Sequence, residues 1–295
     1  MDMSVAHQEA TVRERSDSPL RVAYQGVEGS YSHLAAQLRY AGRPGGTLLV
    51  GHDSFRAAAD EVLAGSADLA LLPIENSTAG SINETYDVLA DGALHITGEL
   101  VSAIEHCLLA LPGVALDELR VVGSHPQALA QCVAFFAAHA QLTARPDLDT
   151  AGAARRVRDA GDRTLAAIAS SAAAQTYGLA IVARGIQSAT GNATRFVEIA
   201  PRPAPVDPAA PAKTSLLVAL ADRPGALGEV LMRFAARGLS LTKLESRPIP
   251  EAPFTYRFYI DVLGHAASEP FTAALDEIRP LTTTLHVLGT YAAAV

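Results

Sequence analysis

Apolar and polar positions alternate with two different periods along the first two hundred residues. Short apolar runs with strand character are each followed by a stretch in which apolar residues recur at helical spacing. The strands are predicted at Arg21–Gln25, Thr47–Gly51 and Ala67–Leu72, and the helices at Ser30–Tyr40, Ser54–Ala64 and Ile82–Leu89. This alternation of strand and helix predicts an α/β domain with a largely parallel sheet.

A second lobe is predicted beyond a longer apolar strand, Glu99–Leu111, which ends at Pro112 and Gly113. This lobe is expected to contain the strands Arg120–Gly123 and Thr164–Ile168 and the helices His125–Ala138, Thr150–Asp159 and one after Ser170. The run Ala180–Arg184 then returns the chain toward the first lobe. Two crossings leave a cleft between the lobes, which is the usual place for a small ligand.

A proline-dense segment, Ala200–Ala212, favours an extended spacer. The elements after it are predicted as strand Thr214–Leu220, helix Pro224–Ala236, strands Leu241–Ile249 and Phe254–Leu263, helix Ser268–Ile278 and strand Thr283–Tyr291. This β-α-β-β-α-β order is that of a small ferredoxin-like domain. The predicted domains are a flexible tail at 1–19, an α/β domain at 20–200 with its second lobe at about 100–180, a linker at 201–212 and the small domain at 213–295.

Composition and charge exclude several classes of protein. With 295 residues and a net charge of −8 without blocks of like charge, the chain is expected to have about two domains and no nucleic-acid site. The charged first 19 residues exclude a signal peptide, and the longest apolar run is too short to span a membrane. The two cysteines, Cys107 and Cys132, indicate reduced thiols in the cytoplasm, and the histidines show no metal-ligand spacing.

Lysine is absent from the first 212 residues. The α/β domain therefore contains neither the lysine of a phosphate-binding P-loop nor a lysine that could form a Schiff base. No cofactor and no metal are expected.

Four polar segments are predicted to be loops: GVEGSYSH at 26–33, PIENSTAG at 73–80, SHPQ at 124–127 and GNATRF at 191–196. Three of them precede or open a helix, where free backbone N–H groups favour an anion. Capping boxes are predicted for Ser81 with Glu84 and for Ser124 with Gln127.

The last of these segments begins a strand in which Thr194 and Arg195 face opposite sides. A guanidinium can grip a carboxylate with two hydrogen bonds, so Arg195 is a candidate ligand for an acid. The hydroxyl donors predicted for the same pocket are Ser30, Ser77, Ser124 and Thr194.

These segments resemble the prephenate dehydratase family, and the C-terminal pattern resembles the ACT domain that its members carry. The motifs PIENS at 73–77, SHPQALAQC at 124–132, ATRF at 193–196 and ESRP at 245–248 occur in the family's order between about Arg21 and Ala292. The resemblance implies a two-lobed, periplasmic-binding-protein-like α/β catalytic domain followed by a ferredoxin-like ACT domain. It also implies cofactor-free conversion of prephenate to phenylpyruvate, water and carbon dioxide.

The resemblance implies roles for particular residues. Thr194 is expected to hydrogen bond at the leaving hydroxyl, while Glu75 and His125 are titratable candidates for its proton, and Ser124 belongs to the same catalytic set. The substrate-binding residues are expected to be Ser30, Tyr31, Asn76, Ser77, Gln127, Ser171, Arg195 and Phe196. Glu75 has the equally weighted alternative of bracing the turn beside it, and Ser81 is expected to be a helix cap only.

In the C-terminal domain the resemblance implies a regulatory site for phenylalanine. Its residues are expected to be Gly225, Ala226, Leu227, Glu245, Ser246, Arg247 and Pro248, placed across a subunit interface. We therefore expect a cytoplasmic homodimer or homotetramer with the effector phenylalanine, and no nucleic-acid or membrane partner. Arogenate dehydratase and a catalytically silent amino-acid sensor are the alternatives, and no chorismate mutase segment is expected before Arg21.

Overall fold

The computed structural model describes residues 18–250 and 252–294, so residues 1–17 of the expected tail lie outside the described residues. The chain divides into two compact units. Among the described residues, the first consists of 18–71, 75–80 and 102–194, and the second of 72–74, 81–101, 195–250 and 252–294.

The first sheet has the strand order β2-β1-β3-β11-β5, with β4 paired to β3. Its strands are β1 (Leu20–Gln25), β2 (Thr47–His52), β3 (Leu69–Asn76), β4 (Gly80–Ser81), β5 (His95–Ala103) and β11 (Ala193–Ala200). The helices between them are α2 (Tyr31–Arg39), α3 (Phe55–Leu63) and α4 (Asn83–Leu89). Strand β1 runs parallel to both β2 and β3, which confirms the predicted parallel α/β pattern.

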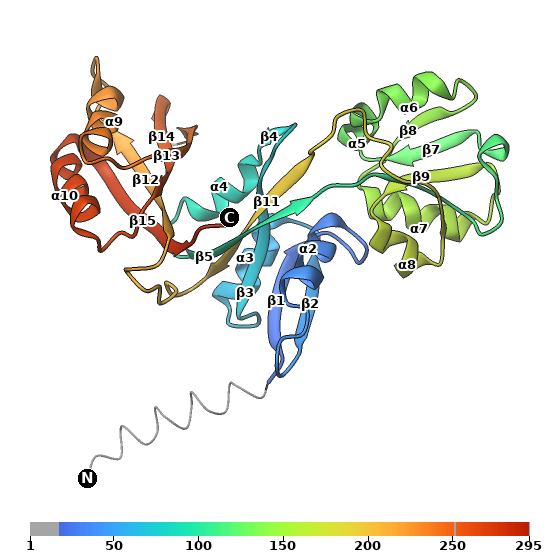
Figure 1. Cartoon of the computed structure of the whole chain (residues 1–295), viewed down its shortest axis with the longest axis horizontal. Coiled ribbons are helices and arrows are strands. Elements are labelled where there is room, and N and C mark those ends of the chain that lie inside the picture. The colour runs from blue at the N-terminus through green and yellow to red at the C-terminus, as the bar shows by residue number, and fades with distance from the viewer. Residues whose placement is uncertain (1–17, 251, 295) are drawn as a thin grey trace, which may run out of the picture. The chain divides into compact units, whose positions relative to one another are not determined.

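The second sheet has the order β10-β6-β9-β7-β8, of which Figure 1 labels β9, β7 and β8. Its strands are β6 (Cys107–Ala110), β7 (Val121–Ser124), β8 (Thr143–Pro146), β9 (Leu165–Ala169) and β10 (Ala180–Ala183). Its helices are η1 (Leu116–Glu118), α5 (Pro126–Gln131), α6 (Val133–Ala138), α7 (Thr150–Ala160) and α8 (Ser171–Tyr177). Alternate residues of β6 and β9 enter two separate cores, one with α7 and α8 and the other with α5, so helices cover both faces.

The predicted crossings between the two sheets are displaced. The expected strand Glu99–Leu111 is two strands that belong to different sheets, and the chain crosses between them at 104–106 rather than at Pro112. The run Ala180–Arg184 was predicted to return the chain, but β10 lies in the second sheet, paired with β6. The break was missed because the apolar residues on both sides of Glu105 and His106 were read as one strand.

Local predictions also failed at other positions. The predicted helix His125–Ala138 is divided at Cys132 into α5 and α6, and β8 was not predicted. The PIENS motif is not a loop up to Asn76, since β3 continues through it and the turn begins only afterwards. Ser81 is not a helix cap, because the N-cap of α4 is Ile82.

The C-terminal part has the predicted ferredoxin-like order. Its elements are β12 (Ala212–Leu220), α9 (Ala226–Ala236), β13 (Leu241–Ile249), β14 (Ala252–Leu263), α10 (Glu269–Ile278), η2 (Arg279–Leu281) and β15 (Thr282–Ala292). The antiparallel sheet has the order β13-β14-β12-β15, and α9 and α10 pack on one of its faces around Phe234 and Phe271 (Figure 1). The other face carries the charged side chains described below.

Candidate active site

Asn76, the last residue of β3, anchors a cluster of polar side chains. The turn after it brings two backbone N–H groups, those of Thr78 and Ala79, to the side-chain oxygen of Asn76 at 3.0 and 2.9 Å. These two bonds fix which end of the carboxamide is the oxygen. Its amide nitrogen therefore faces Oγ1 of Thr194 at 3.0 Å and Oδ1 of Asn192 at 2.9 Å.

Thr194, the second residue of β11, is placed by a set of bonds on either side of it. The Ser77 N–H donates to the carbonyl of Ala193 at 2.8 Å, and the Ala193 N–H donates to the Ser77 hydroxyl at 3.0 Å. Both Thr194 and Asn76 are buried, at 7% and 8% exposure. Within residues 18–250 and 252–294, no acceptor takes the hydrogen of the Thr194 hydroxyl, which leaves that hydrogen available to a ligand.

Gln131, at the end of α5, joins this cluster from the second sheet. Its Nε2 donates to the Thr78 hydroxyl at 2.7 Å, and its Oε1 accepts from Nδ2 of Asn192 at 3.1 Å. The Thr78 hydroxyl in turn lies 2.7 Å from Oδ1 of Asn76. Four residues from three segments of the chain, Asn76, Thr78, Gln131 and Asn192, thus form one hydrogen-bonded network beside Thr194.

Sequence reasoning identified some members of this network and missed others. It singled out Asn76, Ser77 and Thr194, and the structure brings all three together. It missed Thr78, Gln131 and Asn192, and also His106, whose Nε2 lies 2.7 Å from Oε1 of Gln131. A usable signal was present for Gln131, which lies four residues after Gln127 in SHPQALAQC and so on the same side of a helix.

Two of the predicted catalytic residues, Ser124 and His125, lie where β7 ends and α5 begins. The Ser124 hydroxyl is fully buried and donates to the carbonyl of Ile168 at 2.6 Å, so it joins β7 to β9 and is not the predicted cap. His125 is the N-cap instead, and its Nδ1 accepts from the N–H of Gln127 at 3.2 Å. The side chains of His125 and Gln127 are exposed, and their catalytic and binding roles stay predictions.

The remaining predicted residues lie at several helix starts and strands. Ser30 is the N-cap of α2 and accepts from the N–H of His33 at 3.2 Å. Ser171 is the first residue of α8, whose cap is Ser170. Glu75 is half-buried on β3 and, as the neighbour of Asn76 in a strand, lies on the opposite side of it.

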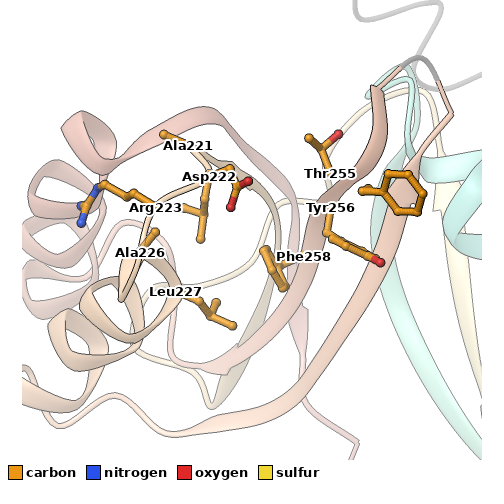
Figure 2. A pocket seen from close by; sticks show the side chains of 10 residues that line it. Ala221, Asp222, Arg223, Ala226, Leu227, Thr255, Tyr256 and Phe258 are labelled. Atoms are coloured by element: carbon orange, nitrogen blue, oxygen red, sulfur yellow. The ribbon is translucent and has the colours of Figure 1, made fainter.

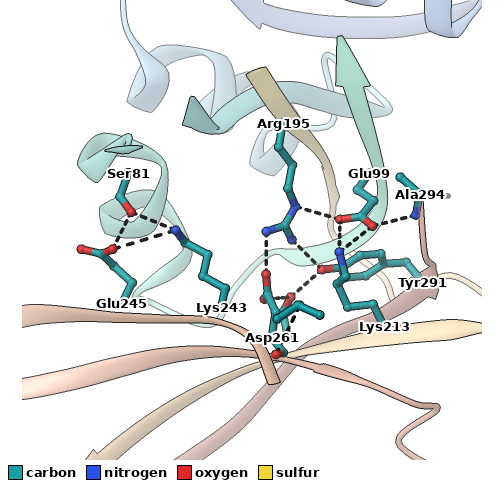
Figure 3. A network of polar contacts seen from close by, with 11 residues as sticks. Ser81, Glu99, Arg195, Lys213, Lys243, Glu245, Asp261, Tyr291 and Ala294 are labelled. Atoms are coloured by element: carbon teal, nitrogen blue, oxygen red, sulfur yellow. Dashed lines mark hydrogen bonds and ion pairs between the residues drawn. The ribbon is translucent and has the colours of Figure 1, made fainter. Parts of the chain in front are cut away.

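Arg195 is held by the protein's own carboxylates. Its Nε lies 2.7 Å from Glu99 and its NH1 lies 2.6 Å from Asp261, while NH2 donates to the Tyr291 hydroxyl at 3.1 Å (Figure 3). The Lys213 ammonium group completes the set with two contacts to Glu99 at 2.7 and 2.9 Å. The positive charge of the guanidinium is therefore balanced by two carboxylates of the protein. Binding of a substrate carboxylate by Arg195 stays a prediction.

The carboxylate of Glu99 depends on this network for its charge. Burial alone raises the pKa of Glu99, but the hydrogen bonds from Lys213 and the Ala294 N–H and the charge of Arg195 outweigh it, so the pKa is below its ordinary value. Phe196, next along β11, is almost fully buried. Its predicted contact with substrate also stays a prediction.

The C-terminal sheet contains a pocket of about 160 Å³ at the start of α9. It is lined by Leu220, Ala221, Asp222, Arg223, Ala226, Leu227, Phe254, Thr255, Tyr256 and Phe258. Figure 2 shows Leu227 of α9 and Phe258 of β14 lying toward each other, with Tyr256 beside them. The pocket thus combines an apolar interior with the ionisable side chains of Asp222 and Arg223.

The predicted effector residues divide between this pocket and another surface. Ala226 and Leu227 line the pocket, and Gly225 is the N-cap of α9 with a φ of 80°. The Glu245 carboxylate instead accepts from the Ser81 hydroxyl at 2.5 Å (Figure 3). The guanidinium of Arg247 lies 3.3 Å from the carboxylate of Asp87. Ser246 and Pro248 lie on the same strand, β13, which is separated from β12 by β14.

Among the residues that the structure describes, no group of three or more His, Cys, Asp or Glu side chains could hold a metal ion. In the same part of the chain, no helix is long and apolar enough to cross a membrane. Both cysteines are free and buried.

The chain combines an α/β part that contains two sheets with a C-terminal domain of the β-α-β-β-α-β, ferredoxin-like class. The prephenate dehydratase profile matches residues 22–204, and the ACT domain profile matches residues 214–280. The chain therefore belongs to the prephenate dehydratase family, and the resemblance stated from its motifs is confirmed. Its fold is the expected one, with two periplasmic-binding-protein-like lobes and an ACT domain.

Relatives in this family are named after two substrates, arogenate and prephenate. Arogenate dehydratase 1 of Petunia hybrida is 43% identical over 289 residues, which cover 93% of this chain and 67% of the relative. The bifunctional chorismate mutase/prephenate dehydratase of Enterobacter agglomerans is 37% identical, with 98% of this chain and 76% of the relative covered.

Two solved structures match almost the whole chain. Prephenate dehydratase from Arthrobacter aurescens in complex with L-Phe is 32% identical with a TM-score of 0.85, and the match covers 93% of this chain and 90% of that one. A structure described as a novel type of quorum quenching acylase is 36% identical with a TM-score of 0.84, covering 93% of this chain and 98% of that one.

Proposed function

We propose that this protein is a prephenate dehydratase that converts prephenate to phenylpyruvate, water and carbon dioxide. The observation that carries the proposal is the Thr194 hydroxyl, which accepts a hydrogen bond from the backbone-fixed amide of Asn76 and keeps its own hydrogen for a ligand. Loss of the ring hydroxyl and of the ring carboxylate as carbon dioxide makes the substrate aromatic. The driving force is thus in the substrate, and the protein needs to orient it and to help the hydroxyl leave.

In this mechanism Thr194 donates a hydrogen bond to the departing hydroxyl oxygen, which leaves as water once it has gained a proton. A threonine hydroxyl is too weak an acid to supply that proton itself. Glu75 and His125 are the titratable groups that we propose for this step. Ser30, Tyr31 and Ser77 are proposed to bind the polar groups of the substrate, since they lie at a helix start and at the turn that holds β11.

Arogenate is the second candidate substrate, because several relatives are named arogenate dehydratases. Arogenate has an amino group where prephenate has the side-chain keto oxygen, and its reaction at the ring is otherwise the same. The hydrogen-bond network at Thr194 acts on the ring hydroxyl, so it serves either substrate equally.

We propose that phenylalanine regulates the enzyme by binding in the pocket at the start of α9. The apolar side chains of Leu227, Tyr256 and Phe258 suit a phenyl ring, and Asp222 suits an ammonium group. The N-terminal end of α9, an 11-residue helix, favours a carboxylate. The relative from Arthrobacter aurescens was solved in complex with L-Phe.

We also propose a cytoplasmic homodimer or homotetramer. The nine-residue strand β13 lies at the edge of the C-terminal sheet, and such an edge can pair with a second copy. Two free, buried cysteines suit a reducing compartment. Sedimentation of the purified protein at several concentrations tests the assembly, and a single species of monomer mass would oppose it.

The activity is tested by measuring phenylpyruvate formed from prephenate and phenylalanine formed from arogenate, each with and without added phenylalanine. Faster turnover of prephenate that responds to added phenylalanine is the expected result. Preference for arogenate would assign the second candidate. Inactivity on both substrates with phenylalanine still bound would instead indicate an amino-acid sensor.

A further inference from the structure

His106 lies beside the polar cluster, in the segment that joins β5 to β6, and is only 2% exposed. Its Nε2 lies 2.7 Å from Oε1 of Gln131, and its Nδ1 lies 2.6 Å from the Tyr31 hydroxyl. The backbone N–H of His106 donates to Oε1 of Gln187 at 3.0 Å, and its backbone carbonyl accepts from the N–H of Ile186 at 3.1 Å. The imidazole is therefore held in one place and reaches the cluster through Gln131.

The direction of each hydrogen bond in the cluster follows from two backbone groups. Because the N–H groups of Thr78 and Ala79 donate to Oδ1 of Asn76, the amide nitrogen of Asn76 faces Oδ1 of Asn192. Asn192 must then present its own amide nitrogen to Gln131, whose Oε1 accepts at 3.1 Å. This assignment leaves Nε2 of Gln131 to donate to the Thr78 hydroxyl at 2.7 Å.

The same sequence of bonds fixes the tautomer of His106. Since Oε1 of Gln131 is an acceptor, Nε2 of His106 carries a hydrogen and donates it. The Tyr31 hydroxyl has one hydrogen and two acceptors within reach, Nδ1 of His106 at 2.6 Å and the carbonyl of Glu105 at 3.0 Å. Burial lowers the pKa of His106, which favours the neutral ring, whose Nδ1 accepts from this hydroxyl. The donors thus run in one direction from Tyr31 through His106 to Gln131.

A half-turn of the Gln131 amide would break this order. Its amide nitrogen would then face two other donors, Nδ2 of Asn192 and Nε2 of His106, and its oxygen would face the Thr78 hydroxyl. That hydroxyl would turn its hydrogen to Gln131 and cease to donate to Asn76. The orientation of Gln131 therefore decides the hydrogen bonds around the residue that holds Thr194.

We propose that His106 is a positioning residue of the active site, which donates from Nε2 to hold the Gln131 carboxamide in the orientation that lets the Thr78 hydroxyl donate to Asn76, the residue that holds Thr194. The effect on catalysis rests on the proposed function. The tautomer of His106, by contrast, is a property of the protein alone and is tested without a substrate.

The kinetic test compares His106→Leu with His106→Gln, in the natural protein and in a Gln131→Ala background. Leucine removes the donor, whereas the amide of glutamine can place an N–H near the position of Nε2. We expect His106→Leu to lower kcat by about tenfold, the effect of one hydrogen bond, with KM within about twofold, and His106→Gln to recover most of the loss. In the Gln131→Ala background, His106→Leu is expected to have no further effect on kcat.

Two kinetic outcomes would overturn the proposal. Equal losses for leucine and glutamine would mean that the N–H donor is irrelevant, and additive losses in the double variant would mean that His106 does not act through Gln131. Melting temperature and phenylalanine binding by calorimetry, measured on every variant, identify any that fails to fold. For such a variant, the His106→Gln and tautomer measurements decide.

The tautomer test uses ¹⁵N-detected spectra of the histidine rings at pH 7, with the resonance of His106 identified by its loss in His106→Gln. A neutral ring with its hydrogen on Nε2 is the expected result. A hydrogen on Nδ1, or a charged ring, would refute the assignment whether or not the protein turns over prephenate or arogenate.

Discussion

At the scale of single residues, the site depends on two side chains: the carboxamide of Asn76, which the backbone holds in one orientation, and the hydroxyl of Thr194, whose hydrogen is available to a ligand. The oxygen of Asn76 receives two main-chain N–H groups, and this makes its nitrogen a donor to Thr194. Thr194 is left with one hydrogen to give. Thr194, a residue type that is common in strands, can therefore direct a hydrogen bond to a ligand.

Replacing that hydroxyl tests its role directly. We expect Thr194→Ala to lower kcat by about 10²–10³-fold with a small change in KM, because the bond to the leaving oxygen strengthens as the bond to carbon breaks. Thr194→Ser keeps the hydroxyl and is the matched control, expected to stay within about tenfold of the natural rate. Steady-state kinetics with prephenate measures both, and a Thr194→Ala enzyme of normal kcat would remove Thr194 from the mechanism.

At the scale of elements, β11 carries a catalytic candidate and a structural ion network on adjacent residues. Arg195 lies between the carboxylates of Glu99 on β5 and Asp261 on β14, and Lys213 on β12 shares Glu99 (Figure 3). Buried charges of this kind are stable only as a set, because removing one partner leaves another uncompensated. The strand is therefore fixed at Arg195, the residue that follows Thr194.

This network predicts a particular dependence of stability on pH. The pKa of Glu99 is depressed in the folded protein, so its contribution is fully present above the ordinary value of 4.5 and is lost as the pH falls through the folded-state pKa. We expect Glu99→Gln to be about 3 kcal/mol less stable than the natural protein at pH 7, with the difference narrowing below about pH 4.5. Urea unfolding across this pH range measures the effect.

Glu118→Gln is the matched control for Glu99→Gln. Glu118 also has a lowered pKa, from the Ala115 N–H and Arg163, but it lies on the surface, where water screens its charges. Its substitution is expected to change stability little at any pH in the range. If the difference in free energy of unfolding between the natural protein and Glu99→Gln stayed constant down to pH 3, the stabilisation by Glu99 would not depend on its charge.

Much of this fold was predictable from the sequence, because apolar residues recur with one period in helices and with another in strands. The order of the elements along the C-terminal domain and the limits of β13 were predicted as found. The break at 104–106 was not predicted, since the apolar residues of two successive strands read as one run. The extent of β3 was missed because Pro73 is a residue that usually ends a strand.

The site was predictable only where motif and geometry coincide. Asn76, Ser77 and Thr194 belong to polar segments that stand out in the sequence, and they meet in the structure. His106 lies inside the segment that was predicted as one apolar strand, and Gln131 lies in a helix, and in neither place does the polar residue give a sign of its partner. Arg195 was assigned to substrate because the sequence does not reveal that Glu99 and Asp261 lie beside it.

At the scale of the whole molecule, regulation requires that phenylalanine bind two states of the enzyme with different affinity. The change in activity that it produces is then limited by that difference, typically about 1–3 kcal/mol or about 5–150-fold. The same coupling applies in reverse, so a substrate analogue at the active site changes the affinity for phenylalanine by the same factor. This reciprocity makes the regulatory proposal measurable by binding alone.

Two glycines of α9 offer a matched pair of variants for this test. Gly225 at the start of the helix and Gly238 just after its end both have positive φ, 80° and 69°, and a Cβ added to either meets nothing within 4 Å. Alanine therefore introduces a similar backbone strain of about 1 kcal/mol at both positions. Only the methyl group at Gly225 stands at the end of the helix where we place the carboxylate of phenylalanine.

We expect Gly225→Ala to weaken phenylalanine binding by about tenfold or more, with the uninhibited kcat unchanged, and Gly238→Ala to bind phenylalanine as the natural protein does. Calorimetric titration gives each Kd, and the rise in melting temperature with phenylalanine gives an independent value, since a ligand stabilises only the state that it binds. Equal weakening in both variants would mean that backbone strain, and not contact with the ligand, accounts for the loss. Unchanged binding in Gly225→Ala would place the effector elsewhere on the domain, and the surface of β13 around Ser246 would then be the next position to substitute.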